Sequence, residues 1–260
     1  RALSFTGSTE IGRLLYAQSA PTIKRLVMEL GGHAPFIAFA DCDLERAVDR
    51  AVSAKFATSG QDCLAVNRFY IERPIYEVFV AAFAERVRAL RLGAGLADPD
   101  IGPLINARAV AKQQAHVADA LAKGARLVCG GHVHVAGPNF FEPTVLADVP
   151  EGAAVFSEET FGPVAAFAPF DTEAEVLAKA NRTETGLVAY LHTSDASRIA
   201  RMSGPCAFHC TTMPRRISRI SASSRSCSAI ASNRACAAAS SGIARVSTAS
   251  TSCGSPVKWR

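Results

Sequence analysis

Short apolar runs alternate along this chain with segments in which apolar residues recur three and four positions apart. The first pattern is typical of a buried strand and the second of an amphipathic helix. We therefore expect strands at residues 2–5, 35–40, 68–71, 126–129, 141–146, 164–167 and 186–192. Helices are expected at residues 44–58, 75–90, 106–123 and 173–180, after an earlier helical pattern through Leu14, Leu15 and Gln18. Strands that alternate with helices predict an α/β layered fold with parallel strand pairing.

Three residues mark the ends of predicted helices. Asp43 has the side chain of an N-cap, which accepts a hydrogen bond from the first turn. Gly60 and Gly124 are expected to end the helices that precede them, because glycine adopts the left-handed conformation of a helix C-terminus. Cys63 then lies on a turn just beyond a helix, a position from which a side chain can face a cleft.

The C-terminal segment has a different composition from the rest. Residues 196–260 contain nine Arg, one Lys and no acidic residue, so the net charge of +5 comes entirely from this end of the chain. Residues 221–250 are mainly Ser, Ala and Arg, and no strand is expected there. Three interpretations of the tail, residues 204–260, are open. They are a disordered basic tail that binds nucleic-acid phosphates, a cysteine-bearing module, and out-of-frame translation of a GC-rich gene. We favour the third, because the change is abrupt and falls inside an α/β unit.

Length and composition exclude some classes of protein. The 260 residues suit one or two domains, and 49% hydrophobic residues are enough for a substantial core. No apolar run approaches the roughly 18 residues of a membrane span, so no membrane partner is expected. Cys42, Cys63 and Cys129 show no disulfide-like spacing, which fits a reducing compartment and a cytoplasmic location. The sequence begins at Arg1, so a targeting signal cannot be judged.

An acidic residue and a later cysteine are the strongest candidates for catalysis. Glu29 opens the segment ELGGH, and Cys63 closes the segment SGQDC. A thiol with a pKa of about 8.5 is only a few per cent ionised at neutral pH, so a catalytic Cys needs help from its surroundings. Glycines let the backbone come close to a ligand, and here they are Gly31, Gly32 and Gly60.

Two further patterns indicate binding only weakly. Gly7 and Ser8 stand between a predicted strand and a helix, an arrangement that directs backbone N–H groups at a phosphate. The spacing is not the usual fingerprint of three glycines, so an ordinary turn before a helix stays possible. His132 and His134 alternate, but no third ligand is near, and we expect exposed loop histidines and no metal.

Four motifs together resemble the aldehyde dehydrogenase superfamily. They are FTGSTEIG at residues 5–12, ELGG at 29–32, GQDC at 60–63 and EETFGP at 158–163. Their order and separations are similar to those of the family, over about residues 1–203. The resemblance implies that Cys63 attacks an aldehyde to give a thiohemiacetal and then a thioester. Glu29 would be the general base that activates water for hydrolysis.

The resemblance also implies a cofactor, either NAD or NADP. Gly7 and Ser8 would contact its pyrophosphate. Leu30 and Gly31 would contact its nicotinamide, and Glu159 and Phe161 would contact its nicotinamide ribose. The backbone N–H of Cys63 would donate one oxyanion hydrogen bond. The implied partner is a small-molecule aldehyde, with no nucleic acid, and the full-length form is expected to be a homo-oligomer.

Residues 29–67 are most similar to succinate-semialdehyde dehydrogenases and related members, with two departures. Those enzymes typically carry an Arg six positions before the nucleophile to pair with a distal carboxylate, and this sequence has Ala57 there. Asp62 stands where uncharged residues are commoner, and a carboxylate facing Cys63 should raise the pKa of the thiol. The alternative is that Asp62 points into solvent.

The resemblance implies three parts of the chain. Residues 1–30 would be the end of a Rossmann-like NAD(P)-binding domain, residues 31–203 a three-layer catalytic domain, and residues 204–260 the atypical tail. The family's second oxyanion donor would lie upstream of Arg1, and loss of one such donor typically costs about 10²–10³ in rate. We therefore expect this chain by itself to be a poor or inactive catalyst.

Two other functions are open at this stage. One is a different thiol enzyme, such as an acyl-transfer hydrolase that uses Cys63 with His33 as its base and no nicotinamide. The other is a non-catalytic truncated interaction protein that works through its basic tail. Binding of a nicotinamide cofactor would favour the dehydrogenase over the acyl-transfer hydrolase. Salt-dependent binding to generic DNA would favour the interaction protein.

Overall fold

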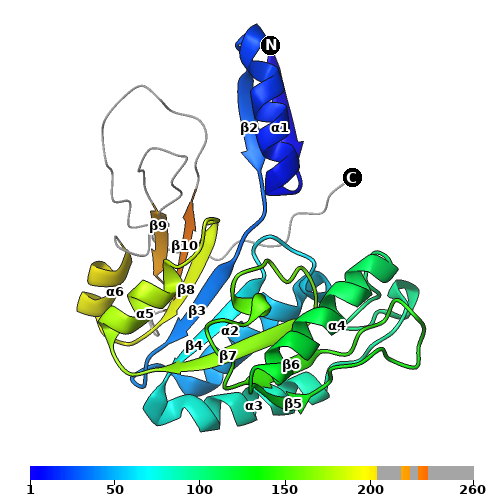
Figure 1. The fold of residues 1–260 in the computed structure, drawn as a ribbon. Helices are drawn as coiled ribbons and strands as arrows, with labels where there is room; N and C mark the ends of the chain where they lie inside the picture. The colour runs from blue at the N-terminus through cyan, green and yellow to red at the C-terminus, as the bar shows by residue number, and fades with distance from the viewer. Residues whose placement is uncertain (204–217, 223–227, 234–260) are drawn as a thin grey trace, which may run out of the picture.

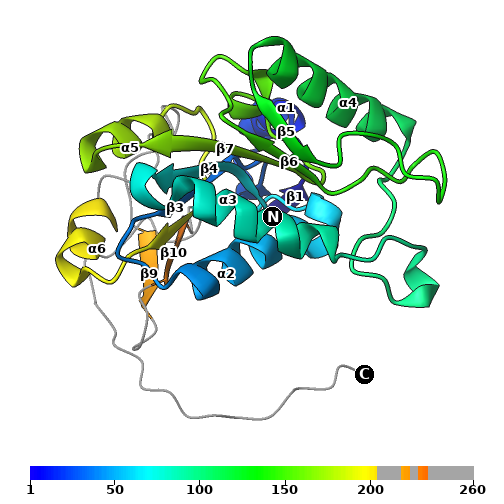
Figure 2. The ribbon, with the colours of Figure 1, turned by 90° about the horizontal axis from the view of Figure 1, so that it is seen from below.

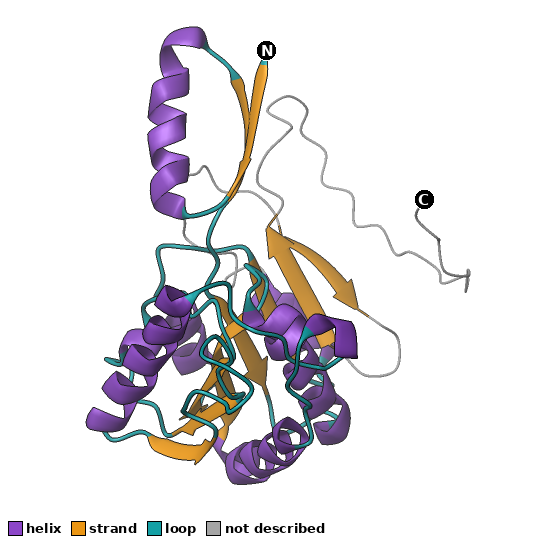
Figure 3. Ribbon diagram, turned by 90° about the vertical axis from the view of Figure 1, so that its right-hand side faces the viewer, coloured by secondary structure: helices purple, strands orange, loops and turns teal. Residues whose placement is uncertain are grey.

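The computed structural model describes residues 1–203, 218–222 and 228–233. Two parts are distinct in Figures 1 and 3: an arm (residues 1–30), which projects from one end, and a body (residues 31–203), which holds most of the helices. The chain passes from the arm to the body immediately after Glu29.

The arm is a single β-α-β unit. It consists of β1 (Ala2–Thr6), α1 (Thr9–Ser19) and β2 (Arg25–Glu29), and the two strands pair in parallel. The sequence pattern predicted β1 and α1 but missed β2, because the hydrogen bonds that define β2 come from β1 and leave no local signal. In α1 only Gly12 and Ser19 are buried, so most of the helix is exposed.

A mixed sheet runs through the body. Its strands are β3 (Ala34–Ala38), β4 (Val66–Glu72), β5 (Arg126–Cys129), β6 (Thr144–Ala147), β7 (Val164–Phe170), β8 (Val188–His192), β9 (Ser218–Ala222) and β10 (Ser228–Asn233). Their order is β5-β6-β7-β4-β3-β8-β10-β9. The five strands from β6 to β8 pair in parallel, which confirms the predicted α/β fold.

Helices cover both faces of this sheet, as Figure 2 shows. They are α2 (Leu44–Phe56), α3 (Tyr76–Arg88), α4 (Ala107–Ala122), α5 (Glu173–Ala180) and α6 (Ala196–Ser203). Neighbouring residues of β3 point to opposite faces: Phe36 packs in the core with α2 and α3, and Ile37 in the core with α4, α5 and α6. The body is thus a three-layer α/β/α structure with two apolar cores.

Most predicted elements lie within three residues of their observed bounds, but one helix ends early. Asp43 caps α2 as expected and accepts a hydrogen bond from the Arg46 N–H at 3.2 Å. The helix ends at Phe56 rather than near Gly60, because Thr58 and Ser59 take left-handed backbone angles. This early end creates the turn that carries Cys63.

The expectation that residues 221–250 contain no strand was wrong. β10 falls inside that segment and pairs antiparallel with β8 and with β9. The edge of a parallel sheet presents free backbone N–H and C=O groups, so it can order a segment whose own pattern is weak. Of the three interpretations of the tail, the cysteine-bearing module and the nucleic-acid contact rest largely on residues outside the described ranges.

No helix in the described part of the chain is both long and apolar enough to cross a membrane. Among the same residues, no group of three or more His, Cys, Asp or Glu side chains is placed to hold a metal ion.

Candidate active site

The turn that carries Cys63 is held in an unusual backbone conformation. Thr58, Ser59 and Gly60 follow one another with φ angles of 52°, 59° and 70°. At Gly60 a Cβ atom would stand 2.4 Å from the carbonyl oxygen of Gly162, so only glycine fits against that strand of backbone. The Ser59 hydroxyl accepts a hydrogen bond from the Gly102 N–H at 2.9 Å, which fixes the turn to the body.

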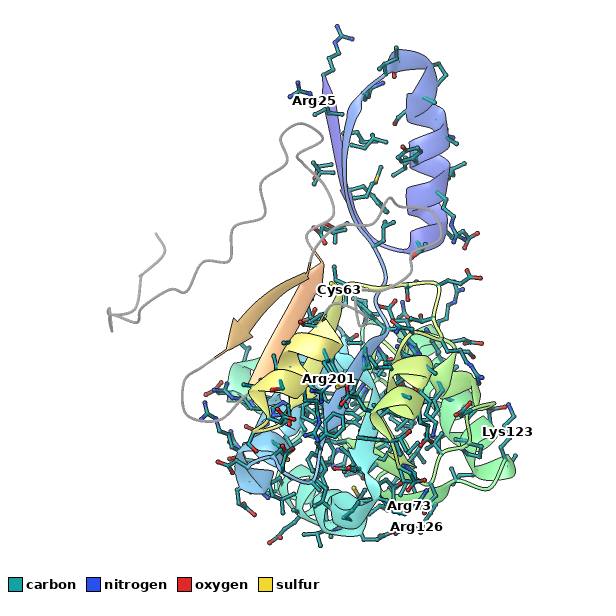
Figure 4. The ribbon with its side chains drawn as sticks, turned by 90° about the vertical axis from the view of Figure 1, so that its left-hand side faces the viewer. Arg25, Cys63, Arg73, Lys123, Arg126 and Arg201 are labelled. Atoms are coloured by element: carbon teal, nitrogen blue, oxygen red, sulfur yellow. The ribbon has the colours of Figure 1, made fainter. Side chains whose placement is uncertain are left out.

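Cys63 is a free, half-buried thiol at the end of the body that faces the arm (Figure 4). Burial raises the pKa of this thiol, and the charge and hydrogen bonding of Asp62 raise it further. Asp62 accepts a hydrogen bond from the Leu64 N–H at 2.9 Å, and the Tyr190 hydroxyl donates to the Leu64 carbonyl at 3.0 Å. The Asp62 carboxylate thus lies on the same turn as the thiol and raises the pKa of that thiol, which agrees with the first of the two alternatives left open by the sequence.

The glycine pair after Glu29 lies against the cysteine turn. A Cβ atom on Gly32 would stand 2.2 Å from the carbonyl oxygen of Cys63. The Gly32 N–H donates a hydrogen bond to the Glu159 carboxylate at 2.9 Å. A Cβ atom on Gly31 would stand 2.9 Å from the same carboxylate and 3.4 Å from the Thr9 hydroxyl. Residues from all four motifs, which are far apart in the sequence, thus lie together where the arm meets the body.

The segment that contains Glu159 is fixed by three polar side chains. Asn67 accepts a hydrogen bond from the Thr160 N–H at 2.8 Å, Gln113 donates to the Thr160 carbonyl at 3.0 Å, and Lys112 donates to the Glu159 carbonyl. Burial raises the pKa of Glu159, against the opposing effects of the Gly32 N–H, Lys112 and Lys55. Phe161 follows, 41% exposed and left-handed, with a φ of 48°.

Glu29 lies near this site, at the end of β2. Gly32 follows it three positions later, so its Cα lies within about 11 Å of the residue that contacts Cys63. Its carbonyl accepts a hydrogen bond from the Gly7 N–H at 3.0 Å. Its side chain is exposed and makes no hydrogen bond or ion pair with another described residue. The role of Glu29 as a base stays a prediction.

The start of α1 and the space at Gly31 fit the nicotinamide dinucleotide that the sequence implies. Ser8 is the N-cap of α1 and accepts a hydrogen bond from the Ile11 N–H at 3.4 Å, so the free N–H groups of the first turn face outward. Between Thr9 and Glu159, Gly31 leaves open the volume that a side chain would fill. The Leu30 side chain packs instead on Gly12, where a Cβ atom would stand 2.4 Å from it.

His33 is in a loop, as expected, but it is not placed to act as a base. Its ring is 2% exposed, and burial, with the charge of Arg68, lowers its pKa to about 3. Arg68 donates two hydrogen bonds to the His33 carbonyl, at 2.8 and 3.2 Å, which fixes the loop without involving the ring. This geometry disfavours the hydrolase alternative.

Three polar residues of the site were not found from the sequence. Asn67 is buried beside the apolar Val66 in β4, and Lys55 falls on the buried face of α2 with Val48 and Ala51. A polar residue in an apolar stripe was the available signal at both positions. Tyr190 gave no such signal, because a tyrosine in a buried strand looks like an ordinary core residue.

A β-α-β arm joins a three-layer α/β/α body, and the Cys63 thiol lies at the end of the body that faces the arm. The model of the aldehyde dehydrogenase family matches residues 1–213, and this chain belongs to that family. The resemblance drawn from the four motifs is confirmed.

Several of the similar proteins are semialdehyde dehydrogenases. The chain is 52% identical over 204 residues to a succinate semialdehyde dehydrogenase of Acinetobacter baylyi, covering 78% of this chain and 42% of that protein. It is 49% identical over 204 residues to a glutarate-semialdehyde dehydrogenase of Pseudomonas aeruginosa, with the same coverage. The chain thus spans about two fifths of the length of these relatives.

Solved structures agree with these relatives. An NADP-dependent enzyme of Escherichia coli superposes with a TM-score of 0.79 and 50% identity, over 80% of this chain and 44% of that one. A succinate-semialdehyde dehydrogenase of Burkholderia pseudomallei gives a TM-score of 0.79 and 48% identity, also over 80% of this chain and 44% of that one.

Proposed function

We propose that this chain carries the thiol site of an NAD(P)-dependent aldehyde dehydrogenase, with Cys63 as nucleophile and Glu29 as general base. The observation that carries the proposal is the contact of Gly32 with both the Cys63 turn and the Glu159 carboxylate. That single glycine lies between the cysteine turn and the proposed cofactor clamp, and the proposed base stands three positions before it in the chain. The whole enzyme's activity is proposed from the part of it that this chain spans.

The proposed reaction uses the residues of this junction in order. The Cys63 thiolate attacks the aldehyde carbon, and the Cys63 N–H donates a hydrogen bond to the oxygen of the thiohemiacetal. The bound cofactor would accept the hydride from that carbon, which leaves a thioester on Cys63. Glu29 removes a proton from water, the hydroxide attacks the thioester, and the carboxylic acid leaves as the Cys63 thiolate is restored.

The names of relatives guide the choice of substrate and cofactor. Succinate and glutarate semialdehydes are named for two of them, and NADP(+) for an Escherichia coli relative that is 52% identical over 203 residues. These semialdehydes and both NAD and NADP are therefore the compounds to assay first. Gly7, Ser8, Leu30, Gly31, Glu159 and Phe161 would contact the cofactor. A cytoplasmic location and a homo-oligomeric full-length form stay predictions.

An activated ester tests the thiol chemistry without a cofactor. p-Nitrophenyl acetate should acylate Cys63 in a rapid burst of p-nitrophenol and then turn over slowly as water hydrolyses the thioester. Cys63→Ser should abolish the burst. Glu29→Gln should keep the burst but slow the later turnover by about 10²-fold or more, because the general base is absent. A burst of equal size in Cys63→Ser would disprove the assignment of the nucleophile.

Cofactor binding is tested separately, by titration of the chain with NADH and NADPH while nicotinamide fluorescence is recorded. Glu159→Gln keeps the shape of the side chain, and the Gly32 N–H can still donate to its amide oxygen, so weaker binding in this variant would report the lost charge. No fluorescence change in the unaltered chain, alongside an intact ester burst, would favour a thiol hydrolase instead.

A further inference from the structure

Among the residues that the structure describes, the charges that act on Cys63 are negative. The Asp62 carboxylate is on the same turn, and the Glu159 carboxylate reaches the same region through its hydrogen bond to Gly32. Both carboxylates disfavour the thiolate form of Cys63, as a negative charge must when it lies close to a second one. An aldehyde that reacts at this sulfur therefore comes close to two described carboxylates.

The Asp62 carboxylate is fixed in place rather than free to turn away. It accepts the Leu64 N–H at 2.9 Å, which closes a local turn around the cysteine. The Tyr190 hydroxyl donates to the Leu64 carbonyl. Burial raises the pKa of Tyr190 to about 12, and the negative charge of Asp62 contributes to this increase. Tyr190 therefore stays neutral and adds no third negative charge.

The cations near Glu159 in the described part of the chain do not face the thiol. Lys55 is completely buried, on the last turn of α2. Lys112 is partly buried, and its ammonium donates to the Glu159 carbonyl. Ala57, which precedes the turn, is exposed and has no charge. Neither lysine is among the charges that act on the Cys63 thiol, which are those of Asp62 and Glu159.

We propose that this site takes an aldehyde without a negative charge, and that it prefers a short aldehyde with an ammonium group close to the carbonyl. The proposal rests on the function proposed above and specifies its substrate class. It separates this chain from relatives that are named for acid semialdehydes, whose carboxylate would approach Asp62.

Three thiol reagents of different charge measure the potential at Cys63 directly. Methanethiosulfonates that carry a trimethylammonium group, a sulfonate group or only a methyl group would be reacted with the chain. Labelling of the tryptic peptide 56–68 is then followed by mass spectrometry, because that peptide contains Cys63 and no other cysteine. The ratio of the cationic to the anionic labelling rate should be about tenfold higher at Cys63 than at a small free thiol. This is the effect expected of one fixed charge at close range.

Asp62→Asn is the decisive variant, because its amide oxygen can still accept the Leu64 N–H. The ratio of cationic to anionic rates should fall by about tenfold. Glu85→Gln is the matched control: it removes one exposed negative charge from α3, whereas Cys63 lies at the other end of the body (Figures 1 and 4). It should leave the ratio unchanged. In the unaltered chain, about 1 M salt should also bring the ratio toward that of a free thiol.

A protection assay extends the test to aldehydes. Trimethylammonioacetaldehyde should slow the reaction of Cys63 with the neutral reagent at lower concentration than butanal does, and succinate semialdehyde should require the highest concentration. The proposed substrate class would be overturned if the ratio of cationic to anionic labelling rates at Cys63 equalled that of a small free thiol and did not change in Asp62→Asn. That result would leave the nucleophile assignment intact. A Cys63 that reacts with none of the reagents would contradict the proposed function itself.

Discussion

At the scale of a single residue, Lys55 is the least expected side chain in the body. It is completely buried, and its ammonium has no hydrogen-bond partner among the described residues. Desolvation lowers the pKa of Lys55 to about 7, although the negative charge of Glu159 acts in the opposite direction. A buried charge of this kind opposes folding, so it should be visible in the pH dependence of stability.

Lys55→Met should remove a pH dependence between about pH 7 and 10.5. In that interval the unfolded chain holds a proton on Lys55 that the folded chain has lost, so the stability of the unaltered chain rises with pH. Below pH 7 both states are charged and the full penalty is present, on the order of several kcal/mol. Urea unfolding of both proteins from pH 6.5 to 10.5 measures the difference. Parallel curves would show that Lys55 is not desolvated.

At the scale of the element, the turn after α2 combines left-handed residues with close backbone contacts. Thr58 and Ser59 both have Cβ atoms and positive φ angles, which cost roughly 1–2 kcal/mol per residue relative to a right-handed conformation. The turn persists because Gly60 lies against Gly162 and Ser59 is bonded to Gly102. Surrounding contacts therefore impose the conformation that places Cys63.

Thr58→Gly should stabilise the protein by about 0.5–1 kcal/mol, because relief of the left-handed strain exceeds the added entropy of the unfolded chain. Ser53→Gly is the control, at an exposed position inside α2, and it should destabilise by about 0.5–1 kcal/mol. The midpoints of chemical unfolding give both values. A loss of stability in Thr58→Gly would mean that the turn is not strained.

Gly32→Ala should destabilise the protein by about 1–3 kcal/mol or more, since its Cβ would stand 2.2 Å from the Cys63 carbonyl and neither backbone can move freely. It should also change the alkylation rate of Cys63. Gly95→Ala is the comparison, because no atom lies within 4 Å of its Cβ position. If the two variants unfold at the same denaturant concentration, the contact between Gly32 and the cysteine turn does not exist.

At the scale of the whole molecule, the arm and the body differ in how much side chain they bury. Within α1 only Gly12 and Ser19 are buried, whereas α3 buries Tyr76, Phe79, Val80, Phe83, Ala84 and Val87. Local stability follows buried apolar contacts. The arm should therefore open on its own while the body stays folded.

Hydrogen exchange followed by mass spectrometry tests this difference. Amides of α1 should exchange at least about 100-fold faster than those of α3, and α3 should exchange only when the body unfolds. A bound nicotinamide nucleotide should slow exchange in α1 selectively, because the proposed pyrophosphate contacts are at its start. Equal protection of α1 and α3 without any ligand would show that the arm and the body unfold together.

The success of the sequence analysis differed between elements for physical reasons. Asp43 was placed at a helix start because an N-cap acts on residues only three positions away. β2 and β10 were missed because each is defined by hydrogen bonds to another strand. The early end of α2 was missed because its cause is the packing of Gly60 on Gly162, which lie about 100 residues apart.

The sequence by itself determined the alternation of strands and helices, the family and the identity of the candidate nucleophile, because periodicity, caps and ordered motifs are local properties. Only the tertiary structure decided that Asp62 raises the pKa of Cys63, that His33 is buried and neutral, and that Lys55, Asn67 and Tyr190 support the site. Burial and the direction of a side chain depend on residues that are distant in the chain. The charge around the thiol was therefore settled by the fold.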